Sequence, residues 1–257
     1  MTTIPHHDTS ALIIGGTEGL GAAIAEHLIA GGCTRMVIAG RDSVKGEAAA
    51  AKLGATFMPV DLADTEAVVA LVDAADAHLG GLNALAVAGA TTERGSILNT
   101  TPESFDRVFT INTRSPYFAL QRFAQNAVAA GRPASVVNIL TVSAYVGQSF
   151  LSPYAASKAA LTNITRNAAQ ALRSDHIRVN GINCGWMDTP GEDRVQRAYH
   201  GAGDDWLALA EADQPMGTLV KPDSVARQAS LMLSPVSGVM TGAIVDFDQH
   251  VIGALPE

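Results

Sequence analysis

A tyrosine and a lysine stand four residues apart at Tyr154 and Lys158. The alanines, serines and leucines around them favour a helix over residues 153–172, and Pro153 fits its first turn. Residues four apart share a helix face, so the ammonium would lie beside the phenol. A nearby cation lowers a phenol pKa from about 10, which predicts a pair that exchanges a proton with a carbonyl oxygen or an alcohol. Taken alone, this spacing also arises by chance on solvated helix faces.

A glycine-rich segment is the second motif that points to chemistry. Residues 11–14 form a short apolar run that predicts a buried strand, and an alanine-rich helical pattern begins after Gly21. Between them, Gly15, Gly19 and Gly21 have the spacing Gly-x-x-x-Gly-x-Gly. In such a turn, backbone N–H groups and the positive end of the helix can approach a pyrophosphate. The flanking strand and helix favour this interpretation over an ordinary glycine turn.

The end of the second predicted strand bears on the choice of nucleotide. Gly40 follows residues 36–39, at the position where an acidic residue would bind the ribose hydroxyls of NAD. Arg41 comes next, and a guanidinium suits the 2′-phosphate of NADP. We therefore expect NADP, with NAD possible because Glu18 adds negative charge near the same pocket. The alternative is a loop arginine that pairs with Asp42 in solvent.

Apolar runs and helical patterns alternate along the whole sequence. This alternation predicts one α/β domain, residues 1–257, with a doubly wound Rossmann-type parallel sheet and helices on both faces. The expected strands are 11–14, 36–39, 56–60, 82–90, 134–140, 178–183 and 243–246. The first expected helix follows Gly21 and ends near Ala30, and the others span 43–53, 64–79, 102–129, 153–172 and 222–234. Residues 191–214 are more polar and predict either a mobile substrate-loop insert over the site or an ordinary surface excursion.

Polar residues lie where chemistry is expected in such a sheet. Thr141 and Ser143 follow residues 134–140, and ligands bind beyond the carboxyl ends of the strands in open α/β sheets. Ser143 would face the same side as Thr141 if the strand continued, so either hydroxyl could contact a substrate oxygen. Asn112 stands in the middle of the predicted helix 102–129, where asparagine is unfavourable.

Composition excludes several classes of protein. The net charge of −8 argues against a nucleic-acid partner or an anionic-membrane surface. No apolar run reaches the ~20 residues of a membrane span, and the opening residues lack the features of a signal peptide. Cys33 and Cys184 lack metal-ligand spacing, so we expect reduced thiols, a cytoplasmic location and no metal site. Only 16% of residues are charged, which fits a sheet covered on both faces or a large subunit interface.

Together these motifs resemble the classical short-chain dehydrogenase/reductase family, from about residue 10 to 248. Their order and intervals carry the resemblance, which implies a cofactor site and a catalytic site. The cofactor-binding residues it implies are Gly15, Thr17, Gly19, Leu20, Gly21, Arg41, Asp61, Leu62, Gly89, Tyr154, Lys158, Gly185, Met187 and Thr189. The catalytic residues it implies are Asn112, Tyr154 and Lys158, with Thr141 in place of the usual serine.

The resemblance further implies an NAD(P)-dependent oxidoreductase that interconverts a carbonyl and a secondary alcohol by hydride transfer. Tyr154 would exchange the proton, Lys158 would lower its pKa and hold the nicotinamide ribose, and Thr141 would bind the substrate oxygen. Asn112 would open its helix locally and hold a water that links Lys158 to solvent. Family members are commonly homotetramers, so we expect a tetramer or dimer built on the helices 102–129 and 153–173.

The substrate is expected to be a small carbonyl or alcohol compound. Ser143, Gln148 and Trp186 are the candidate substrate residues, with the insert beside them. A sugar, a polyol, a steroid-like ketone and a 3-oxoacyl thioester all stay open. Where the family usually has Asn-Asn-Ala-Gly, residues 86–89 of this chain read Ala-Val-Ala-Gly, so Ala86 and Val87 replace both asparagines. Together with Thr141, this departure leaves an alternative, a nucleotide-binding regulatory protein of the same fold with impaired catalysis.

Overall fold

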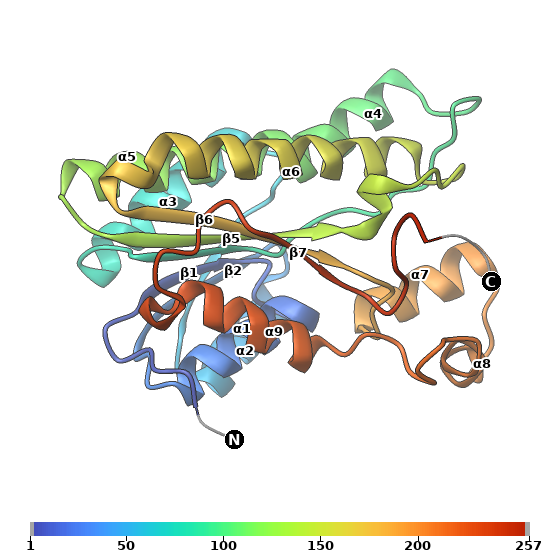
Figure 1. Cartoon of the computed structure of the whole chain (residues 1–257), viewed down its shortest axis with the longest axis horizontal. Helices are drawn as coiled ribbons and strands as arrows, with labels where there is room; N and C mark the ends of the chain where they lie inside the picture. The colour runs from blue at the N-terminus through green and yellow to red at the C-terminus, as the bar shows by residue number, and fades with distance from the viewer. Residues whose placement is uncertain (1–2, 255–257) are drawn as a thin grey trace.

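A parallel β-sheet runs through the middle of the computed structural model, which describes residues 3–254 (Figure 1). Within that range the sheet has seven strands in the order β3-β2-β1-β4-β5-β6-β7. The strands are β1 (Ser10–Ile14), β2 (Arg35–Gly40), β3 (Thr56–Pro59), β4 (Ala84–Val87), β5 (Ala134–Thr141), β6 (Ile177–Cys184) and β7 (Ile244–Phe247). The predicted Rossmann-type sheet is confirmed. Residues 1, 2 and 255–257 of the predicted domain lie outside the described residues.

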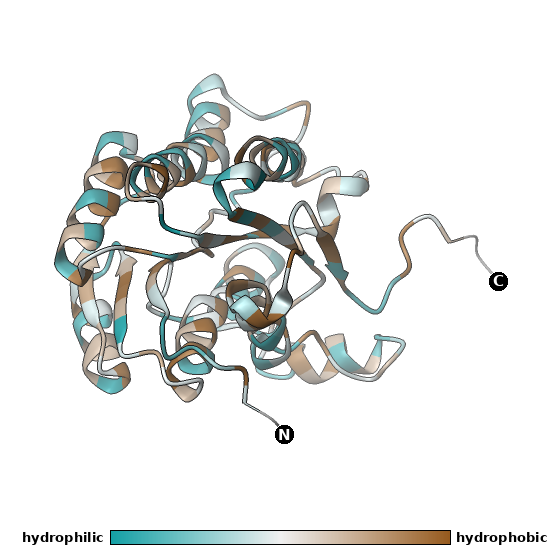
Figure 2. Cartoon of the chain, turned by 60° about the vertical axis from the view of Figure 1, so that its left-hand side comes forward, coloured by the Kyte–Doolittle hydropathy of each residue, from teal (hydrophilic) through white to brown (hydrophobic). Residues whose placement is uncertain are grey.

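Helices cover both faces of this sheet (Figure 1). One face packs against α3 (Thr65–Leu79), α4 (Pro102–Phe109), α5 (Ser115–Ala129) and α6 (Ser152–Leu172). The other packs against α1 (Gly19–Ala30), α2 (Ser43–Leu53) and α9 (Pro222–Leu233). Figure 2, coloured by residue hydropathy, shows hydrophobic strands between the two helix layers, and the helix ribbons carry hydrophilic as well as hydrophobic residues. Two apolar cores therefore form, one on each side of the sheet.

Two of the helices agree closely with the prediction because their ends carry side-chain or backbone signals. Asp42 and Asp64 accept hydrogen bonds from backbone N–H groups in the first turns of α2 and α3. Gly54 and Gly80 follow the last residues of these helices with left-handed backbone angles, which glycine adopts without strain. The predicted strand 82–90 was too long, because Asp76 accepts from the Leu82 N–H and ordered pairing in β4 begins only at Ala84.

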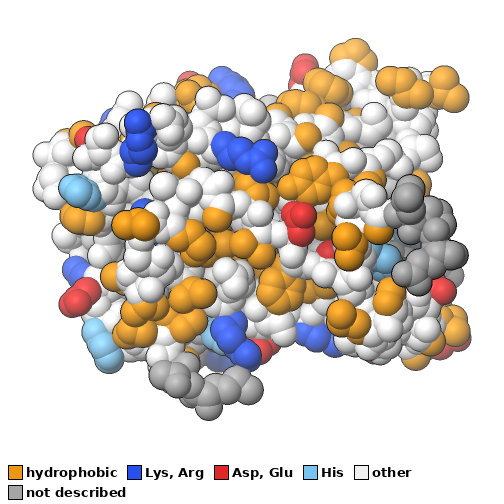
Figure 3. All heavy atoms as spheres, in the orientation of Figure 1, with side chains coloured by type: hydrophobic (Ala, Val, Ile, Leu, Met, Phe, Trp, Pro, Cys, Tyr) orange, Lys and Arg blue, Asp and Glu red, His pale blue; other side chains and the backbone are white. Residues whose placement is uncertain are grey.

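The strand β7 forms one edge of the sheet. Figure 3 shows hydrophobic side chains gathered along the middle of the face on which β7 lies, between α6 and α9. In sequence, β7 is flanked by Val239 and Val251, which are 94% and 79% exposed. An open strand edge beside exposed apolar side chains is a surface that favours association.

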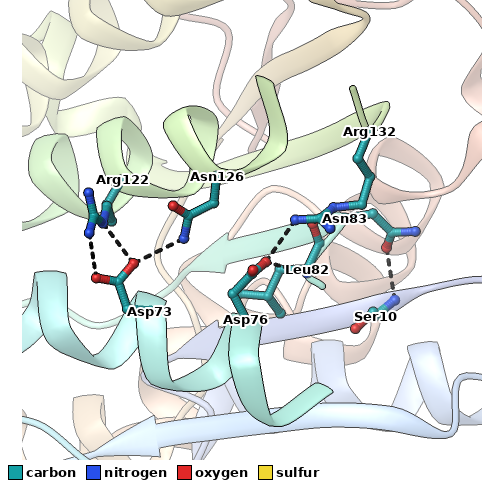
Figure 4. Close-up of polar contacts among 8 residues, drawn as sticks. All are labelled: Ser10, Asp73, Asp76, Leu82, Asn83, Arg122, Asn126 and Arg132. Atoms are coloured by element: carbon teal, nitrogen blue, oxygen red, sulfur yellow. Dashed lines mark hydrogen bonds and ion pairs between the residues drawn. The ribbon is translucent and has the colours of Figure 1, made fainter. Parts of the chain in front are cut away.

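Charged side chains connect the layer of α3 and α5 to the sheet (Figure 4). Arg122 of α5 donates two hydrogen bonds to the Asp73 carboxylate of α3, at 2.7 and 2.8 Å, and Asn126 donates a third. Arg132 then binds Asp76 and the carbonyl oxygen of Leu82, so it ties the loop before β5 to the loop before β4. Paired arginine–carboxylate geometry of this kind fixes how the elements pack.

Residues 191–214, predicted as either a mobile substrate-loop insert or an ordinary surface excursion, are mostly helical. They form α7 (Pro190–His200) and α8 (Trp206–Ala212), which lie beyond the carboxyl ends of the strands (Figure 1). The Trp206 indole donates to Asp193 at 2.7 Å and so joins the two helices. Among residues 3–254, no helix is both long and apolar enough to span a bilayer. The same residues contain no group of three or more His, Cys, Asp and Glu side chains that could hold a metal ion.

Candidate active site

The glycine-rich turn lies at the carboxyl end of β1 and approaches the end of β4. A Cβ atom at Gly15 would overlap the backbone of Gly89, and one at Gly21 would overlap the carbonyl of Gly15. Gly19 has φ of +57°, a conformation that side chains rarely adopt. The Glu18 side chain caps none of the N–H groups at the start of α1. Gly15 and Gly21 thus let the turn fold tightly against β4 and onto itself. The turn fits a pyrophosphate, because the N–H groups at the start of α1 are not capped by a carboxylate.

Other predicted cofactor residues surround this turn. Thr17 packs so closely on Gly40 that a Cβ there would meet its side chain, which explains why β2 ends without an acidic residue. Leu62 packs against Gly89, and Leu20 is buried on α1. Three further residues come from neighbouring segments: Asp61, which accepts from the N–H of Ala63; Arg41, which is exposed; and Thr189, whose side chain faces Gly19.

Gly185 and Met187 lie beyond the end of β6. The Gly185 N–H donates to the carbonyl of Phe247 at 3.0 Å, and a side chain at this position would overlap the Asp248 carboxylate. Met187 forms an isolated parallel bridge with Val220. The segment after β6 is thus held against β7 at Gly185 and against the loop between α8 and α9 at Met187.

Tyr154 and Lys158 share a face of α6, as predicted. Lys158 is 3% exposed and its Nζ donates to the carbonyl of Ile139 on β5 at 2.8 Å. Burial lowers the pKa of Lys158 to about 8, since removal from water disfavours the ammonium. Tyr154 is partly buried. The pair thus faces the carboxyl end of β5.

The predicted direction of the Tyr154 pKa is wrong for this structure. Burial raises the pKa of Tyr154 to about 12, while a hydrogen bond from Thr141 and the positive charge of Arg94 act in the opposite direction. The lysine does not provide the expected stabilisation because its ammonium donates to the β5 backbone rather than to the phenolate. At neutral pH the phenol is therefore protonated and suited to donate a proton.

Thr141 rather than Ser143 lies beside the phenol. Thr141 is the last residue of β5, pairs in register with Cys184 of β6 and is 7% exposed. The strand does not continue, because residues Val142–Tyr145 form a 3₁₀ turn whose Ser143 N–H donates to the Thr141 hydroxyl at 3.2 Å. Ser143 donates its own hydroxyl to Gln148 at 2.9 Å. Ser143 was expected to face the same side as Thr141 only if the strand continued, and the strand ends at Thr141.

Asn112 interrupts its helix, but it does not point at solvent. The predicted helix 102–129 divides into α4, a π-helical segment at Thr110–Arg114 and α5. Inside that segment, Asn112 is fully buried and its amide binds both the N–H and the carbonyl of Thr91, each at 2.9 Å. A third bond goes to the hydroxyl of Ser157, one residue before Lys158. Both side-chain N–H groups are thus used within the protein, and the amide connects the loop after β4 to α6.

The remaining predicted substrate residues lie at the mouth of the site. Trp186 is 40% exposed and its indole donates to Glu192 of α7 at 2.8 Å. Gln148 accepts from Ser143, so both belong to the loop between β5 and α6. Arg94, which sequence reasoning missed, also reaches this region, since its charge acts on Tyr154. Its position just after the carboxyl end of β4 was the available signal.

Comparisons with known proteins agree with this geometry. Residues 15–249 match the family model described as Enoyl-(Acyl carrier protein) reductase. The chain is 31% identical over 242 residues to cis-4-hydroxycyclohexanecarboxylate dehydrogenase of Sinomonas cyclohexanicum, covering 93% of this chain and 94% of that one. It is 28% identical over 239 residues to the NADP-dependent (R)-specific alcohol dehydrogenase of Lentilactobacillus kefiri, covering 91% and 92%. A solved structure titled short chain dehydrogenase/reductase family protein superimposes with a TM-score of 0.82 at 30% identity, covering 95% of this chain and 97% of that one.

Proposed function

This chain belongs to the short-chain dehydrogenase/reductase family and is an oxidoreductase; on that premise we propose that it interconverts a carbonyl and a secondary alcohol with NADP. One observation supports the proposal most strongly: Tyr154, Lys158 and Thr141 come together at the carboxyl end of β5. The glycine turn follows the carboxyl end of β1, in the same parallel sheet. When bound, the nicotinamide supplies or accepts the hydride.

The side chains at this edge divide the remaining work. Tyr154 donates a proton to the carbonyl oxygen in the reductive direction, because its phenol is protonated at neutrality. Thr141 donates a hydrogen bond to the same oxygen as negative charge develops there. Lys158 would hold the ribose hydroxyls of the bound cofactor, with its ammonium kept at the end of β5 by the hydrogen bond to Ile139.

Asn112 acts by positioning. Its amide hydrogen-bonds the loop after β4 and Ser157 of α6. Because Lys158 is the next residue, these bonds would fix where Lys158 lies along β5. The prediction that Asn112 holds a water did not say through which group. Both amide N–H groups of its side chain already donate to protein oxygens. A water between Lys158 and solvent would have to be held by the main chain that the π-helical segment opens.

A cofactor-consumption assay tests the proposal. Over a panel of ketones and aldehydes, we expect steady oxidation of NADPH that depends on the carbonyl compound. The rival function is a nucleotide-binding regulatory protein without useful catalysis, supported by Thr141 and by Ala86 and Val87. Tight NADPH binding with no consumption over the whole panel would favour that rival.

The choice of NADP rests on the charges around the end of β2. Arg41 is exposed and free to meet a 2′-phosphate. Glu18, which could oppose it, forms ion pairs with Arg194 of α7 and with Lys45 of α2. Although partial burial raises it, these two cations hold the pKa of Glu18 below its usual value. The pocket therefore has a net positive charge, and one similar relative is named as NADP-dependent.

Replacing Arg41 by alanine is expected to weaken NADPH binding roughly 10- to 100-fold, since charge-assisted hydrogen bonds to the phosphate are lost. NADH binding should change less than about threefold, as for an ordinary surface substitution. Titration of both cofactors by fluorescence measures this. Arg35→Ala, an exposed arginine at the opposite end of β2, is the matched control. Equal affinity of the unmodified protein for NADPH and NADH would contradict the assignment.

Substrate recognition is proposed for the mouth of the site. Ser143, Gln148 and Trp186 would contact a small carbonyl or alcohol compound, and α7 and α8 would close over it as the substrate loop. The ion pair between Glu18 and Arg194 supports this, because it joins α7 directly to the glycine turn. The Glu18 carboxylate thus connects the glycine turn, proposed to bind the cofactor, to α7, proposed to cover the substrate.

A homo-oligomer, a tetramer or dimer, is also proposed. Exposed apolar side chains on α5 support it, with Tyr117 at 42% and Val128 at 44%, as does the apolar face along β7 (Figure 3). Not every face of α6 is available for such a contact: Ala169 is buried in the apolar core, because its face of α6 packs on the sheet. Part of the predicted apolar run 251–255 lies outside the described residues.

Light scattering at micromolar concentration should therefore give a mass two or four times that of the chain. A charge at the centre of the proposed contact, Val128→Glu, is expected to shift the mass towards the monomer, because a carboxylate loses water on burial without gaining a partner. Val44→Glu, at an exposed position on α2, is the control. A monomeric mass for the unmodified protein would overturn the proposal.

A further inference from the structure

The loop between β4 and α4 is fastened to the protein at alternate residues. Thr91 is bound through its backbone by the Asn112 amide. The Glu93 carboxylate accepts from Arg107 of α4 at 2.9 Å and from Ser104 at 2.7 Å. Gly95 donates to the carbonyl of Phe150 and accepts from Ser152, both at 3.0 Å, which forms a short parallel bridge to the start of α6. The loop is thus rigidly placed two residues ahead of Tyr154.

Arg94 lies between these fastened positions and enters the site. Its Cζ atom is 5.1 Å from the centre of the Phe150 ring and 5.6 Å from that of Tyr199. Its Nη2 donates to Nε2 of His200 on α7 at 2.9 Å. Aromatic rings on both flanks and a hydrogen bond to the insert hold the guanidinium in one orientation.

Two features of the Arg94 guanidinium lack a partner among residues 3–254: its Nε–H donor has no acceptor, and its positive charge has no carboxylate. The Nε atom is buried and has no hydrogen-bond partner among residues 3–254. No carboxylate in that range lies within ion-pair distance of Arg94. Glu93, its neighbour in sequence, is already bound by Arg107, and Glu192 of α7 is bound by Trp186 and Gln196. A buried donor and an unmatched cation are both unfavourable unless an anion arrives.

The position of this cation relates it to the reacting group. Gly95, the residue after Arg94, bridges Leu151, and a Cβ atom on it would lie 3.5 Å from the ring of Pro153, the residue directly before Tyr154. Arg94 therefore lies beside the start of α6, the turn that carries the phenol, and its positive charge acts on Tyr154. The exposed faces of Phe150 and Tyr199, at 43% and 57%, provide apolar walls around it. A ligand that reaches both groups would need a carbonyl or hydroxyl at one end, an anionic group at the other and an apolar body between them.

We propose that Arg94 binds the carboxylate of the substrate, so that the substrates are small oxo acids and the corresponding hydroxy acids. This proposal rests on the proposed function and specifies its substrate class. Arginine suits the role because its planar donors match a carboxylate in two-point hydrogen bonding, with the free Nε–H as one of the two donors.

The test compares oxo acids with their methyl esters, in which the reacting carbonyl is unchanged and the charge is removed. Open-chain and ring compounds with the ketone two to five bonds from the carboxyl carbon are assayed with NADPH. We expect kcat/KM for the best acid to exceed that for its ester by at least about tenfold, chiefly through a lower KM. Equal values for acid and ester across the panel would overturn the proposal.

Variants separate recognition from a purely structural role. Arg94→Met keeps the apolar stem and should lower kcat/KM for acids roughly 10- to 100-fold while esters change less than about threefold. Arg94→Lys should recover part of the loss, because it restores the charge but not the two-point geometry. Arg114→Met, which removes an exposed arginine from the ring of Phe118, should leave both substrate classes unchanged. An equal loss for acids and esters in Arg94→Met would mean that the side chain only supports the loop.

The same assay distinguishes failure of this inference from failure of the proposed function. Turnover of esters and neutral ketones without a preference for acids leaves the oxidoreductase intact and removes the carboxylate site. Absence of turnover with every compound, acids and esters alike, despite tight NADPH binding, removes both.

Discussion

Replacing Tyr154 by phenylalanine is expected to lower kcat by roughly 10²–10⁴-fold, the usual contribution of a positioned proton donor. The phenol carries its proton at neutrality, since burial raises its pKa to about 12, and it lies beside the Thr141 hydroxyl at the carboxyl end of β5. Phenylalanine keeps the ring and its packing, so the fold and the glycine turn should be undisturbed. Cofactor affinity is therefore expected to stay within about threefold of the unmodified protein. Stopped-flow reduction of a carbonyl substrate and a separate NADPH titration measure the two effects.

Tyr117→Phe is the matched control for this variant. Tyr117 lies on α5 with 42% of its side chain exposed and takes no part in the site. Removing its hydroxyl should leave kcat unchanged. Near-normal turnover in Tyr154→Phe would mean that another group delivers the proton, and the assignment would have to be abandoned.

Replacing Thr141 by valine should lower kcat by roughly 10²–10³-fold, the typical effect of losing one donor to a developing oxyanion. Valine keeps the shape and β-branching of threonine while it removes the hydroxyl. The hydroxyl also accepts from the Ser143 N–H and hydrogen-bonds Tyr154, so part of the loss could come from the turn. Thermal unfolding of the variant measures that part. Thr141→Ser should retain the rate and change the range of substrates, because only a methyl group leaves the pocket floor.

Ser143→Ala distinguishes the two hydroxyls of this segment. Ser143 donates to Gln148 and lies in the 3₁₀ turn, so its removal should alter kcat far less than Thr141→Val. If Thr141→Val were fully active and Ser143→Ala inactive, the role would belong to Ser143. Full activity in both variants would mean that this segment provides no donor to the substrate oxygen.

The fold could be predicted because its signals are local. Aspartates before α2 and α3 and glycines after them define helix ends from neighbouring residues alone. Continuous apolar runs such as residues 11–14 of β1, buried at every position, indicate strands covered on both faces. The division of helix 102–129 at Asn112 could only be suspected. Its cause is a set of hydrogen bonds to Thr91 and Ser157, which are distant in sequence.

The candidate site was predictable where residue type and spacing suffice, and not where burial decides. Tyr154 and Lys158 are found from a helical interval, yet the direction of the phenol pKa depends on desolvation and on where the lysine points. Ser143 was kept as a rival of Thr141 because the sequence does not reveal that the strand ends there. Arg94 was missed because nothing in the sequence tells that Arg107 uses Glu93 and leaves its neighbour unpaired.

Transfer of deuterium from labelled NADPH tests the central claim most directly. The protein is incubated with NADPH in which both hydrogens at C4 of the nicotinamide are deuterium and with a carbonyl substrate from the panel, and the product is analysed by mass spectrometry. The account predicts an alcohol with one deuterium on the carbinol carbon, formed by the unmodified protein and lost in Tyr154→Phe. Tight binding of labelled NADPH without deuterium in any product would contradict it.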